Sequence, residues 1–216
     1  MSPLEWVPRN AGQLAAATFD HLILTLVAVG GGLAISVILA LVIRRDRRWY
    51  GPLTAVTGAL YTIPSLALFA VLVPVTGLSV LTAEIGLVSY TLLILLRSLV
   101  AGLDAVPPDV LEASRGAGMS SVQQLVRIQL PLSTPFLIAG LRVATVTTIG
   151  LVMVTALIGE GGLGQVMLRG FNFRNWTAVY AGAVLTVGLA VVADLALAMI
   201  GRALTPWSRR RQPDAS

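Results

Sequence analysis

The sequence predicts an all-α integral membrane protein, a helical bundle with about five transmembrane helices. Hydrophobic residues make up 56% of the 216 residues and charged residues only 12%. The mean hydropathy is +0.86, well outside the range of soluble globular domains. The basic residues are all arginines, and several form short clusters beside long apolar runs. Such clusters usually fix the orientation of a membrane protein, so we do not expect this chain to bind nucleic acid.

The residue types that are missing exclude several chemistries. The chain has no cysteine and no lysine, and His21 is its only histidine. A Walker A loop needs lysine, structural zinc sites need clusters of cysteine and histidine, and a hydrolase triad needs a placed histidine. We therefore expect no cofactor or metal bound by this chain, no P-loop and no membrane-embedded enzyme. His21, beside Asp20 at the entry to the first span, is expected to lie at the membrane interface without a chemical role.

The first two spans follow from uncharged runs. Residues 22–43 carry no charge, and as a helix they would be about 33 Å long, enough to cross a hydrocarbon core of about 30 Å. The sequence RRDRR (Arg44–Arg48) ends this span. The next uncharged run, residues 51–83, is too long for one straight span. Because Pro64 interrupts it, we predict a broken helix over residues 52–73, with an outer loop after it.

Three further spans complete the predicted bundle. Apolar runs predict them over residues 84–103, 136–158 and 176–200. A polar loop over residues 106–131 connects the third span to the fourth, and GEGGLGQVMLRGFNFRN (Gly159–Asn175) forms an outer segment before the fifth. No repeat divides the chain, so we expect a single transmembrane domain over residues 1–216.

The distribution of arginines predicts how the bundle is inserted. With five spans and the N-terminus outside, most arginines and the C-terminus lie on the cytoplasmic side, where arginines are favoured. The inner set is RRDRR, Arg115, Arg127, Arg202 and the tail SRRRQ (Ser208–Gln212). The outer set is Arg9, Arg169 and Arg174.

The polar loop carries strong local signals. Pro107 and Pro108 can start a helix but cannot continue one, so they end the third span and begin a short helix over residues 108–117. Glu112 falls in its early turns, where the helix dipole favours acids. Gly118 suits the left-handed position that ends a helix. The short helix should therefore be set off from both neighbouring spans.

A second short helix is predicted to follow. Ser120 and Gln123 have the spacing of a capping box, which opens a helix. Pro131 and Pro135 are expected to break this helix before the fourth span begins. These signals alone fit a plain amphipathic loop at the membrane surface equally well.

The spacing of the loop resembles the EAA loop of ABC-importer permeases. That pattern is E-A-A, three residues, G, nine residues and I-x-L-P. Here it reads Glu112-Ala113-Ser114, then Gly118, then Ile128-Gln129-Leu130-Pro131. Only Ser114 differs, where the family has alanine, and both residues are small. The resemblance implies that the first helix is a coupling helix for an ATPase, with the ATPase-coupling residues Glu112, Ala113, Ser114, Gly118, Ile128, Leu130 and Pro131.

Two further segments resemble a narrower group of permeases. YTIPSLALFAVLVP (Tyr61–Pro74) and ALIGEGGLG (Ala156–Gly164) look like the corresponding segments of importers for quaternary-ammonium osmoprotectants: glycine betaine, carnitine, choline or proline betaine. The resemblance implies the type I ABC importer permease fold. Methionine-type permeases share the five-span plan and a similar GGLG segment, so a permease for methionine or another amino acid is the alternative.

The resemblance also implies partners and a location. The chain would lie in the inner (cytoplasmic) membrane of a bacterium and pair with a second permease subunit, identical or similar, because five spans are too few to enclose a path alone. Two cytoplasmic ATPase subunits would bind ATP and Mg²⁺. An extracytoplasmic binding protein would deliver the substrate, and membrane lipid would cover the outer surface.

The candidate residues for the translocation path are Tyr61, Thr62, Pro64, Ser65 and Glu160. Pro64 leaves a carbonyl of the preceding turn without its helical partner, and broken helices are common at substrate paths. A simple packing kink is the alternative. Glu160 would attract a cationic substrate, and a solvated loop acid is the alternative. Related permeases often have Gln and Ala at the positions of Tyr61 and Glu160.

Three charged residues fall inside the predicted spans. Arg97, Arg142 and Asp194 lie nearer the inner ends of these spans. A charge within the membrane is costly unless it is paired or reaches the interface. We therefore predict that Asp194 pairs with Arg97 or Arg142 near the cytoplasmic side.

Two other interpretations are weaker. GEGGLG (Gly159–Gly164) formally matches the dinucleotide pattern G-x-G-x-x-G, but it follows a predicted membrane span rather than a strand. Flexible backbone at the outer mouth fits it better. A secondary transporter or channel without ATPases would more naturally show an inverted repeat or several carboxylates at mid-membrane, and the sequence has neither.

Overall fold

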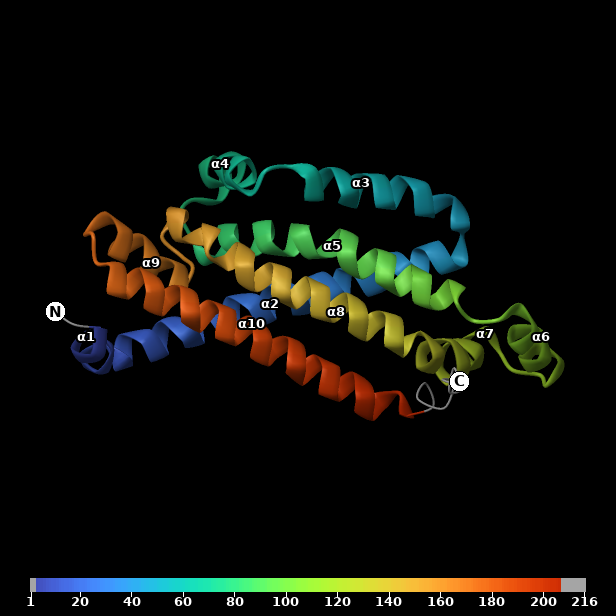
Figure 1. Cartoon of the computed structure of the whole chain (residues 1–216). Coiled ribbons are helices and arrows are strands. Elements are labelled where there is room, and N and C mark those ends of the chain that lie inside the picture. The colour runs from blue at the N-terminus through green and yellow to red at the C-terminus, as the bar shows by residue number, and fades with distance from the viewer. Residues whose placement is uncertain (1–2, 207–216) are drawn as a thin grey trace, which may run out of the picture.

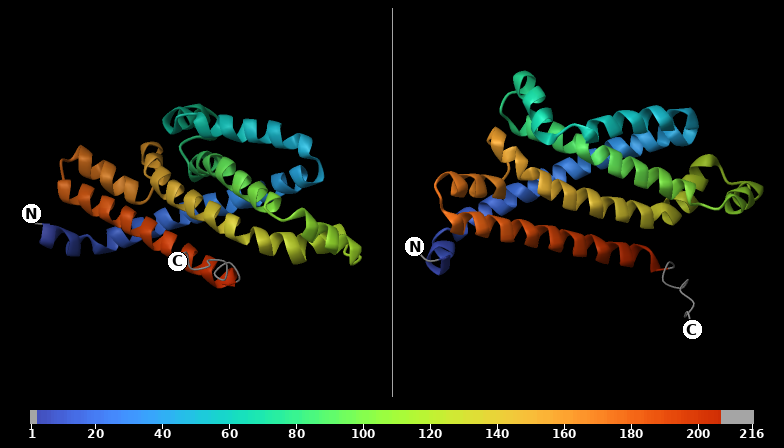
Figure 2. Two further views of the ribbon diagram at one scale, coloured as in Figure 1. Left: turned by 45° about the vertical axis from the view of Figure 1, so that its right-hand side comes forward. Right: turned by 45° about the horizontal axis from the view of Figure 1, so that its top comes forward.

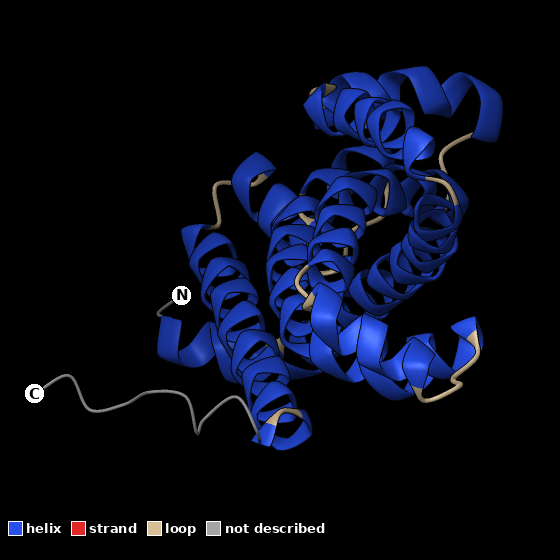
Figure 3. Ribbon diagram, turned by 90° about the vertical axis from the view of Figure 1, so that its right-hand side faces the viewer, coloured by secondary structure: helices blue, strands red, loops and turns tan. Residues whose placement is uncertain are grey.

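Over the described part of the chain, the protein is built from helices alone. The computed structural model describes residues 3–206, and no strand occurs within that range (Figure 3). The helices labelled in Figure 1 are α1 (Pro3–Arg9), α2 (Ala11–Arg45), α3 (Tyr50–Thr62), α4 (Ser65–Thr76), α5 (Val80–Asp104), α6 (Pro108–Gly116), α7 (Ser121–Gln124), α8 (Leu130–Val152), α9 (Leu163–Asn172) and α10 (Trp176–Leu204). Three short segments adjoin them: the 3₁₀ turns η1 (Arg47–Trp49) and η3 (Val154–Ile158), and the π turn η2 (Leu125–Gln129).

The number of spans agrees with the sequence prediction. Four stretches are long and apolar enough to cross a membrane: Ala11–Arg45, Val80–Asp104, Ser121–Ile158 and Trp176–Leu204. A fifth span arises if α3 and α4 count as one broken helix, because the pair passes the same test and is bent by 96°. Pro64 lies at this bend, which confirms the predicted break.

The spans form a bundle with two distinct ends. α2 packs against α5 and α8, which also pack on each other. α3 and α4 lie along one edge of the bundle and α10 along the opposite edge, in both views of Figure 2. α6 and α7 lie at one end, which we call the α6 end; α1 and α9 lie at the other, the α9 end (Figure 1).

Apolar side chains join the three central helices. Leu24 and Ala28 of α2 meet Leu87 of α5 and Val152 of α8, and all four are buried. A second cluster joins α2 to α5 nearer the α6 end; its buried members are Ala40, Ile43, Leu96, Leu99 and Val100. In the most apolar stretch of α5 half of the residues are buried, but in that of α10 none are. α10 therefore offers its apolar surface to lipid or to another chain.

Pro131 and Pro135 do not break a helix, so that prediction is wrong. The helix runs from Ser121 through the π turn into α8. The π turn ends just before Pro131, and its extra residue displaces the carbonyls that a proline ring would meet in a regular α-helix.

Other boundaries also differ from the prediction. α2 begins at Ala11, well before residue 22, because no proline interrupts the intervening residues. The outer loop expected after residue 73 is reduced to residues 77–79, because α4 continues through Pro74. Within the outer segment, α9 is an amphipathic helix that the sequence analysis did not foresee. The tail SRRRQ lies outside the described residues.

Candidate functional site

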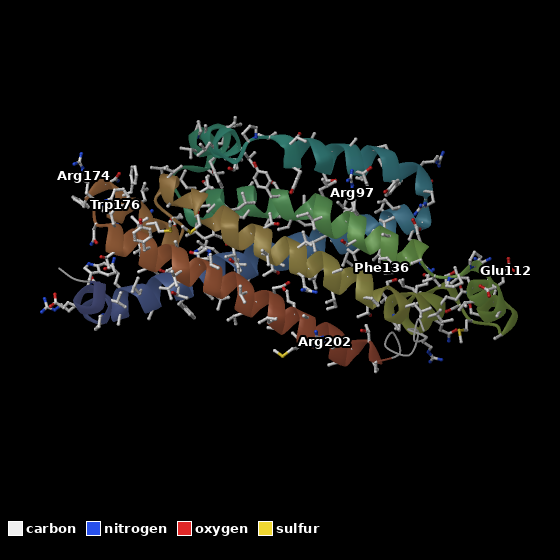
Figure 4. The ribbon with its side chains drawn as sticks, viewed as in Figure 1. Arg97, Glu112, Phe136, Arg174, Trp176 and Arg202 are labelled. Carbon is white, nitrogen blue, oxygen red and sulfur yellow. The ribbon has the colours of Figure 1, made fainter. Side chains whose placement is uncertain are left out.

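The connection between α5 and α8 presents a short helix at the α6 end. α6 begins at Pro108, whose fixed φ and missing N–H suit a first helical turn. Glu112 lies at the far tip of the molecule, away from the bundle (Figure 4). Glu112 and Ala113 are exposed, whereas Ser114 is buried and donates a hydrogen bond to the Leu111 carbonyl at 2.7 Å. One face of α6 is thus open to a partner, while Ser114 lies on the opposite, covered face.

Gly118 makes the turn that follows α6. Its φ is +77°, in the left-handed region, as predicted. Its N–H donates to the Arg115 carbonyl at 2.9 Å, and the Met119 N–H donates to the Ser114 carbonyl at 3.1 Å. A Cβ added at Gly118 would meet no atom within 4 Å. Glycine is therefore required here by backbone conformation and not by lack of space.

The predicted capping box opens α7. The N–H of Gln123 donates to Ser120 Oγ at 3.2 Å, and the Ser120 N–H donates to Gln123 Oε1 at 2.8 Å. Two backbone donors that the helix itself leaves free are satisfied in this way. The turn between α6 and α7 is therefore fixed on both sides, by Gly118 and by this box.

The second half of the EAA-like pattern lies on the π turn and the first turn of α8. Ile128 and Pro131 line a cavity of about 280 Å³ together with Arg127 and Leu132. Leu130 is 45% exposed. The two halves of the pattern therefore lie on separate helices at the same end of the molecule, and the second half is continuous with a membrane span.

Two arginines around the end of α2 bind residues in and beside this loop: Arg44 in the last turn of α2 and Arg47 at the start of η1. Neither contact was predicted from the sequence. Arg44 donates from Nε to Gln129 Oε1 at 2.8 Å and from Nη2 to the Ser121 carbonyl at 3.0 Å. Arg47 donates two parallel hydrogen bonds of 2.9 Å to the carboxylate of Asp104. Because these partners lie 57 to 85 residues away in sequence, no local pattern reveals them.

The other members of the RRDRR cluster behave differently. Asp46 accepts hydrogen bonds from the Arg48 guanidinium at 2.8 to 3.1 Å and from its backbone N–H at 3.1 Å. These bonds, the side-chain ones above all, lower the pKa of the Asp46 carboxyl below its usual value, so it is ionised at neutral pH. Arg45 is exposed and makes no hydrogen bond or ion pair through its side chain with any part of residues 3–206.

The predicted path residues around Pro64 lie at the bend between α3 and α4. Ile63 and Pro64 have extended backbone angles, which separate the two helices. The Tyr90 hydroxyl of α5 donates to the Ile63 carbonyl at 2.5 Å, and its ring meets that of Tyr61 edge-on, with 6.1 Å between centroids. The exposed residues of the segment are Tyr61, Thr62 and Pro64, with Ser65 half-buried. The bend is thus tied to α5 while its outer surface stays open.

Glu160 lies at the α9 end, apart from the residues around Pro64. It lines an open cavity of about 520 Å³ that Asp20 and Arg169 also line. The glycine-rich turn beside it packs directly on α2, because Gly162 has a φ of +49° and a Cβ there would lie 2.4 Å from a backbone oxygen of α2. No described contact joins Glu160 to Pro64, so the five path candidates form two separate groups.

His21 is buried in the bundle, so the prediction of an interfacial histidine is wrong. It has no exposed surface, and its Nε2 lies 3.0 Å from the carbonyl oxygen of Ile149 in α8. That carbonyl has lost its usual helical partner, because the Met153 N–H bonds to the Gly150 carbonyl instead. Since a carbonyl oxygen only accepts, Nε2 carries the proton. His21 therefore satisfies a backbone group where α8 changes into η3.

Asp194 pairs with Arg142, which confirms one of the two predicted pairings. Nε and Nη2 of Arg142 each donate to a different carboxylate oxygen at 2.7 Å. The pair joins α8 to α10 and lines a cavity of about 530 Å³. Arg97, the other candidate, lies partway along α5 (Figure 4) and makes no ion pair within residues 3–206.

Comparison with known proteins places the chain among permeases. A family model described as "Binding-protein-dependent transport system inner membrane component" matches residues 32–206. The chain is 32% identical over 213 residues to the choline transport system permease protein OpuBB of Bacillus subtilis, covering 99% of this chain and 98% of the relative. It is 36% identical over 211 residues to the osmoprotectant import permease protein OsmW of Salmonella typhimurium, covering 95% and 98%. It is 35% identical over 204 residues to the glycine betaine/carnitine/choline transport system permease protein OpuCD of Bacillus subtilis, covering 94% and 89%.

Solved structures share the fold. A chain of the inward-facing MetNI methionine ABC transporter superposes with a TM-score of 0.79 at 24% identity, covering 95% of this chain and 100% of that chain. A chain of an amino acid ABC transporter with histidines gives a TM-score of 0.74 at 16% identity, covering 94% and 99%. These likenesses establish the type I ABC importer permease fold. They do not identify the substrate. With the family model and the nearly full-length relatives in agreement, the chain belongs to the family of inner membrane components of binding-protein-dependent transport systems, as the permease subunit of an ABC importer.

Proposed function

We propose that this permease imports quaternary-ammonium osmoprotectants such as glycine betaine, carnitine, choline or proline betaine. The support is the set of relatives named for choline, osmoprotectant and glycine betaine/carnitine/choline transport, which match nearly the whole chain at 32 to 36% identity. The likeness to the methionine transporter extends to the fold only, because its sequence identity is 24%.

The contact with the ATPase is assigned to α6. The observation that carries this assignment is an exposed helix at the tip of the molecule, with Glu112 and Ala113 outward, Ser114 on the covered face, and its exit angle set by Gly118. Small Ala113 permits close approach to a groove on the partner. Ile128, Leu130 and Pro131 lie where the loop continues into α8, so a push on α6 would pass into that span.

The complete importer contains further subunits. A second permease, identical or similar, completes the path, and two ATPase subunits bind ATP and Mg²⁺ and carry out the hydrolysis, in which this chain has no catalytic role. A binding protein delivers the substrate at the α9 end. In this arrangement the α6 end and the C-terminus face the cytoplasm, and the N-terminus faces outward.

Transport follows alternating access. Closure of the ATPases moves the two coupling helices together and changes which side of the path is open. The bend formed by Tyr61, Thr62, Pro64 and Ser65 lines the path, because its outer surface is open and a broken helix leaves backbone groups free for a ligand. Glu160 lies at the outer mouth, where its charge attracts a cationic group.

Reconstitution tests the substrate and the energy source. The permease, its ATPases and its binding protein would be placed in proteoliposomes, and ATP hydrolysis and uptake would be measured with each osmolyte and with methionine. Glycine betaine, carnitine, choline or proline betaine should stimulate both activities, and methionine should not. Stimulation by methionine alone would assign the chain to amino-acid permeases. Uptake by the permease without any ATPase would make it a secondary transporter.

A charge reversal tests the docking helix. Glu112→Lys should reduce the amount of ATPase that co-purifies with the permease, while the amount inserted in the membrane stays constant. Glu112→Gln keeps the shape of the side chain and should have a smaller effect. Wild-type ATP-dependent uptake by Glu112→Lys would contradict the assignment of α6.

The absence of native cysteine allows a direct test of orientation. Val122→Cys, on α7 at the α6 end, should react with a membrane-impermeant thiol reagent only after the cells are opened. Phe173→Cys, just after α9, should react in intact cells. Both wild-type side chains are strongly exposed, at 69% and 83%. The reverse labelling pattern would place the α6 end outside and overturn the proposed orientation.

A further inference from the structure

Two arginines hold the entrance and the exit of the coupling helix. Arg47 binds Asp104, the last residue of α5, shortly before the chain turns into α6. Arg44 binds both Ser121, the first residue of α7, and Gln129, the last residue of the π turn. The Arg44 guanidinium therefore connects the first residue of α7 to the last residue of the π turn. Arg44 lies in the last turn of α2 and Arg47 begins η1, directly after α2, and the EAA-like pattern includes neither segment.

The space between α6 and the bundle makes these bonds important. A cavity of about 250 Å³ lies there, and Leu111 of α6 lines it together with Arg44, Arg47, Asp104 and Gln129. A hollow contact transmits displacement poorly, because closely packed atoms are what resist compression. The polar bonds beside the cavity connect the loop directly to the end of α2 and to η1.

From this geometry we propose that Arg44 is a positioning residue that transmits movement of the coupling helix to α2, with the Arg47–Asp104 pair as a second, weaker link. The proposal rests on the assignment of α6 as the ATPase contact. Gln129 is 8% exposed, so its bond to Arg44 is shielded from water, whereas Arg47 and Asp104 are about half exposed, at 58% and 49%. Arg47–Asp104 is therefore the more readily screened pair.

The chemistry at Arg44 requires an arginine. Nε and Nη2 donate to two acceptors that lie 8 residues apart along the loop, Ser121 and Gln129. The rigid fork of a guanidinium can hold both at once, whereas a lysine ammonium is a point charge on a flexible stem. A role in topology alone needs only the positive charge, so Arg44→Lys separates the two functions.

The first experiment measures coupling in the assembled importer. Arg44→Ala, Arg44→Lys and Gln129→Leu should each raise the ATP hydrolysed per substrate transported, by about tenfold for the loss of a hydrogen bond to a charged group. Gln129→Glu keeps an acceptor for Arg44 and should stay close to wild type. Arg45→Ala is the matched control, since it removes a neighbouring arginine that makes no such bond, and it should leave the ratio unchanged. Normal coupling in Arg44→Lys and Gln129→Leu would overturn the proposal, as would equal loss in Arg45→Ala.

The second experiment needs no ATPase. Spin labels at Leu41→Cys on α2 and Val122→Cys on α7 would report the distance between these helices in the purified full-length permease by electron paramagnetic resonance. The distance distribution should be narrow in the wild-type and Arg45→Ala backgrounds and broad in Arg44→Ala. An unchanged distribution in Arg44→Ala would refute the link between the loop and α2. If Arg44→Ala broadens the distribution but the permease transports substrate without any ATPase, the proposed function is refuted, whereas the link between the loop and α2 stands.

Discussion

Substitution of Gly118 should uncouple ATP hydrolysis from transport. The glycine has a φ of +77°, and a Cβ there would meet nothing within 4 Å, so alanine would add no clash. The remaining cost is that of a left-handed backbone for a residue with a Cβ, about 1 to 2 kcal/mol. A free energy of that size changes a population ratio by about 5- to 30-fold. Gly118→Ala should therefore lower the fraction of molecules in which this loop adopts the native turn, and the β-branched Gly118→Val should lower that fraction further.

The matched control lies two residues upstream. Gly116 is the last residue of α6, its Cβ position is equally open, and its φ is not in the left-handed region. Gly116→Ala should leave coupling intact, since alanine is favoured over glycine in a helix by about 1 kcal/mol. Gly118→Asn should be intermediate, because asparagine tolerates the left-handed conformation better than alanine does.

The assay is the ratio of uptake to ATP hydrolysis in proteoliposomes that contain all subunits. Membrane insertion and the amount of bound ATPase would be measured in parallel, so that a loss of assembly can be told from a loss of coupling. From the highest to the lowest ratio of uptake to ATP hydrolysis, the expected order is wild type, Gly118→Asn, Gly118→Ala and Gly118→Val. Wild-type coupling in Gly118→Val, or an equal loss in Gly116→Ala, would show that the turn does not set the position of the coupling helix.

Three further substitutions test the path and the bundle. Tyr90→Phe removes the hydrogen bond to Ile63 and should lower the uptake rate by loosening the bend, with ATPase binding unchanged. His21→Ala leaves the Ile149 carbonyl buried and unpaired, which costs about 1 to 3 kcal/mol, so the unfolding temperature of the purified permease should fall. Glu160→Gln should reduce uptake at limiting substrate but not at saturating substrate, because it removes attraction and leaves the path intact.

Each of these three predictions can be contradicted by a specific result. Tyr180 is 68% exposed and its hydroxyl makes no hydrogen bond within residues 3–206, so Tyr180→Phe is the control for Tyr90→Phe, and equal effects would remove the bend from the mechanism. An unfolding temperature of His21→Ala equal to that of wild type would show that the Ile149 carbonyl finds another donor. Unchanged uptake by Glu160→Gln at limiting substrate would reduce that residue to a solvated loop acid.

Local signals in the sequence predicted the turn between α6 and α7 well. The capping box of Ser120 and Gln123 and the left-handed Gly118 each depend on neighbours within a few residues, so sequence spacing determines them. The pairing of Asp194 with Arg142 was predictable for another reason. Few charges are available inside the spans, and an acid there has few possible partners.

Contacts between distant segments could not be predicted in the same way. His21 meets a carbonyl 128 residues away, and that carbonyl is free only because α8 changes its hydrogen-bonding pattern after Gly150. The bond from Arg44 to Gln129 spans 85 residues. Pro131 misled the prediction because its usual effect was offset by the π turn before it. In each case the deciding partner becomes visible only once the helices are packed.

The π turn over Leu125–Gln129 also makes the length of the loop matter. A helix turns by about 100° per residue, and a π turn holds one residue more than a regular turn. Deleting Val126, which is exposed, would remove that extra residue and restore a regular turn, so the segments on either side would keep roughly their present orientation around the axis of α8. The ring of Pro131 would then meet a carbonyl of the preceding turn, as it does in any regular α-helix. A deletion in this turn should therefore destabilise the start of α8 far more than a substitution at an exposed position of the turn.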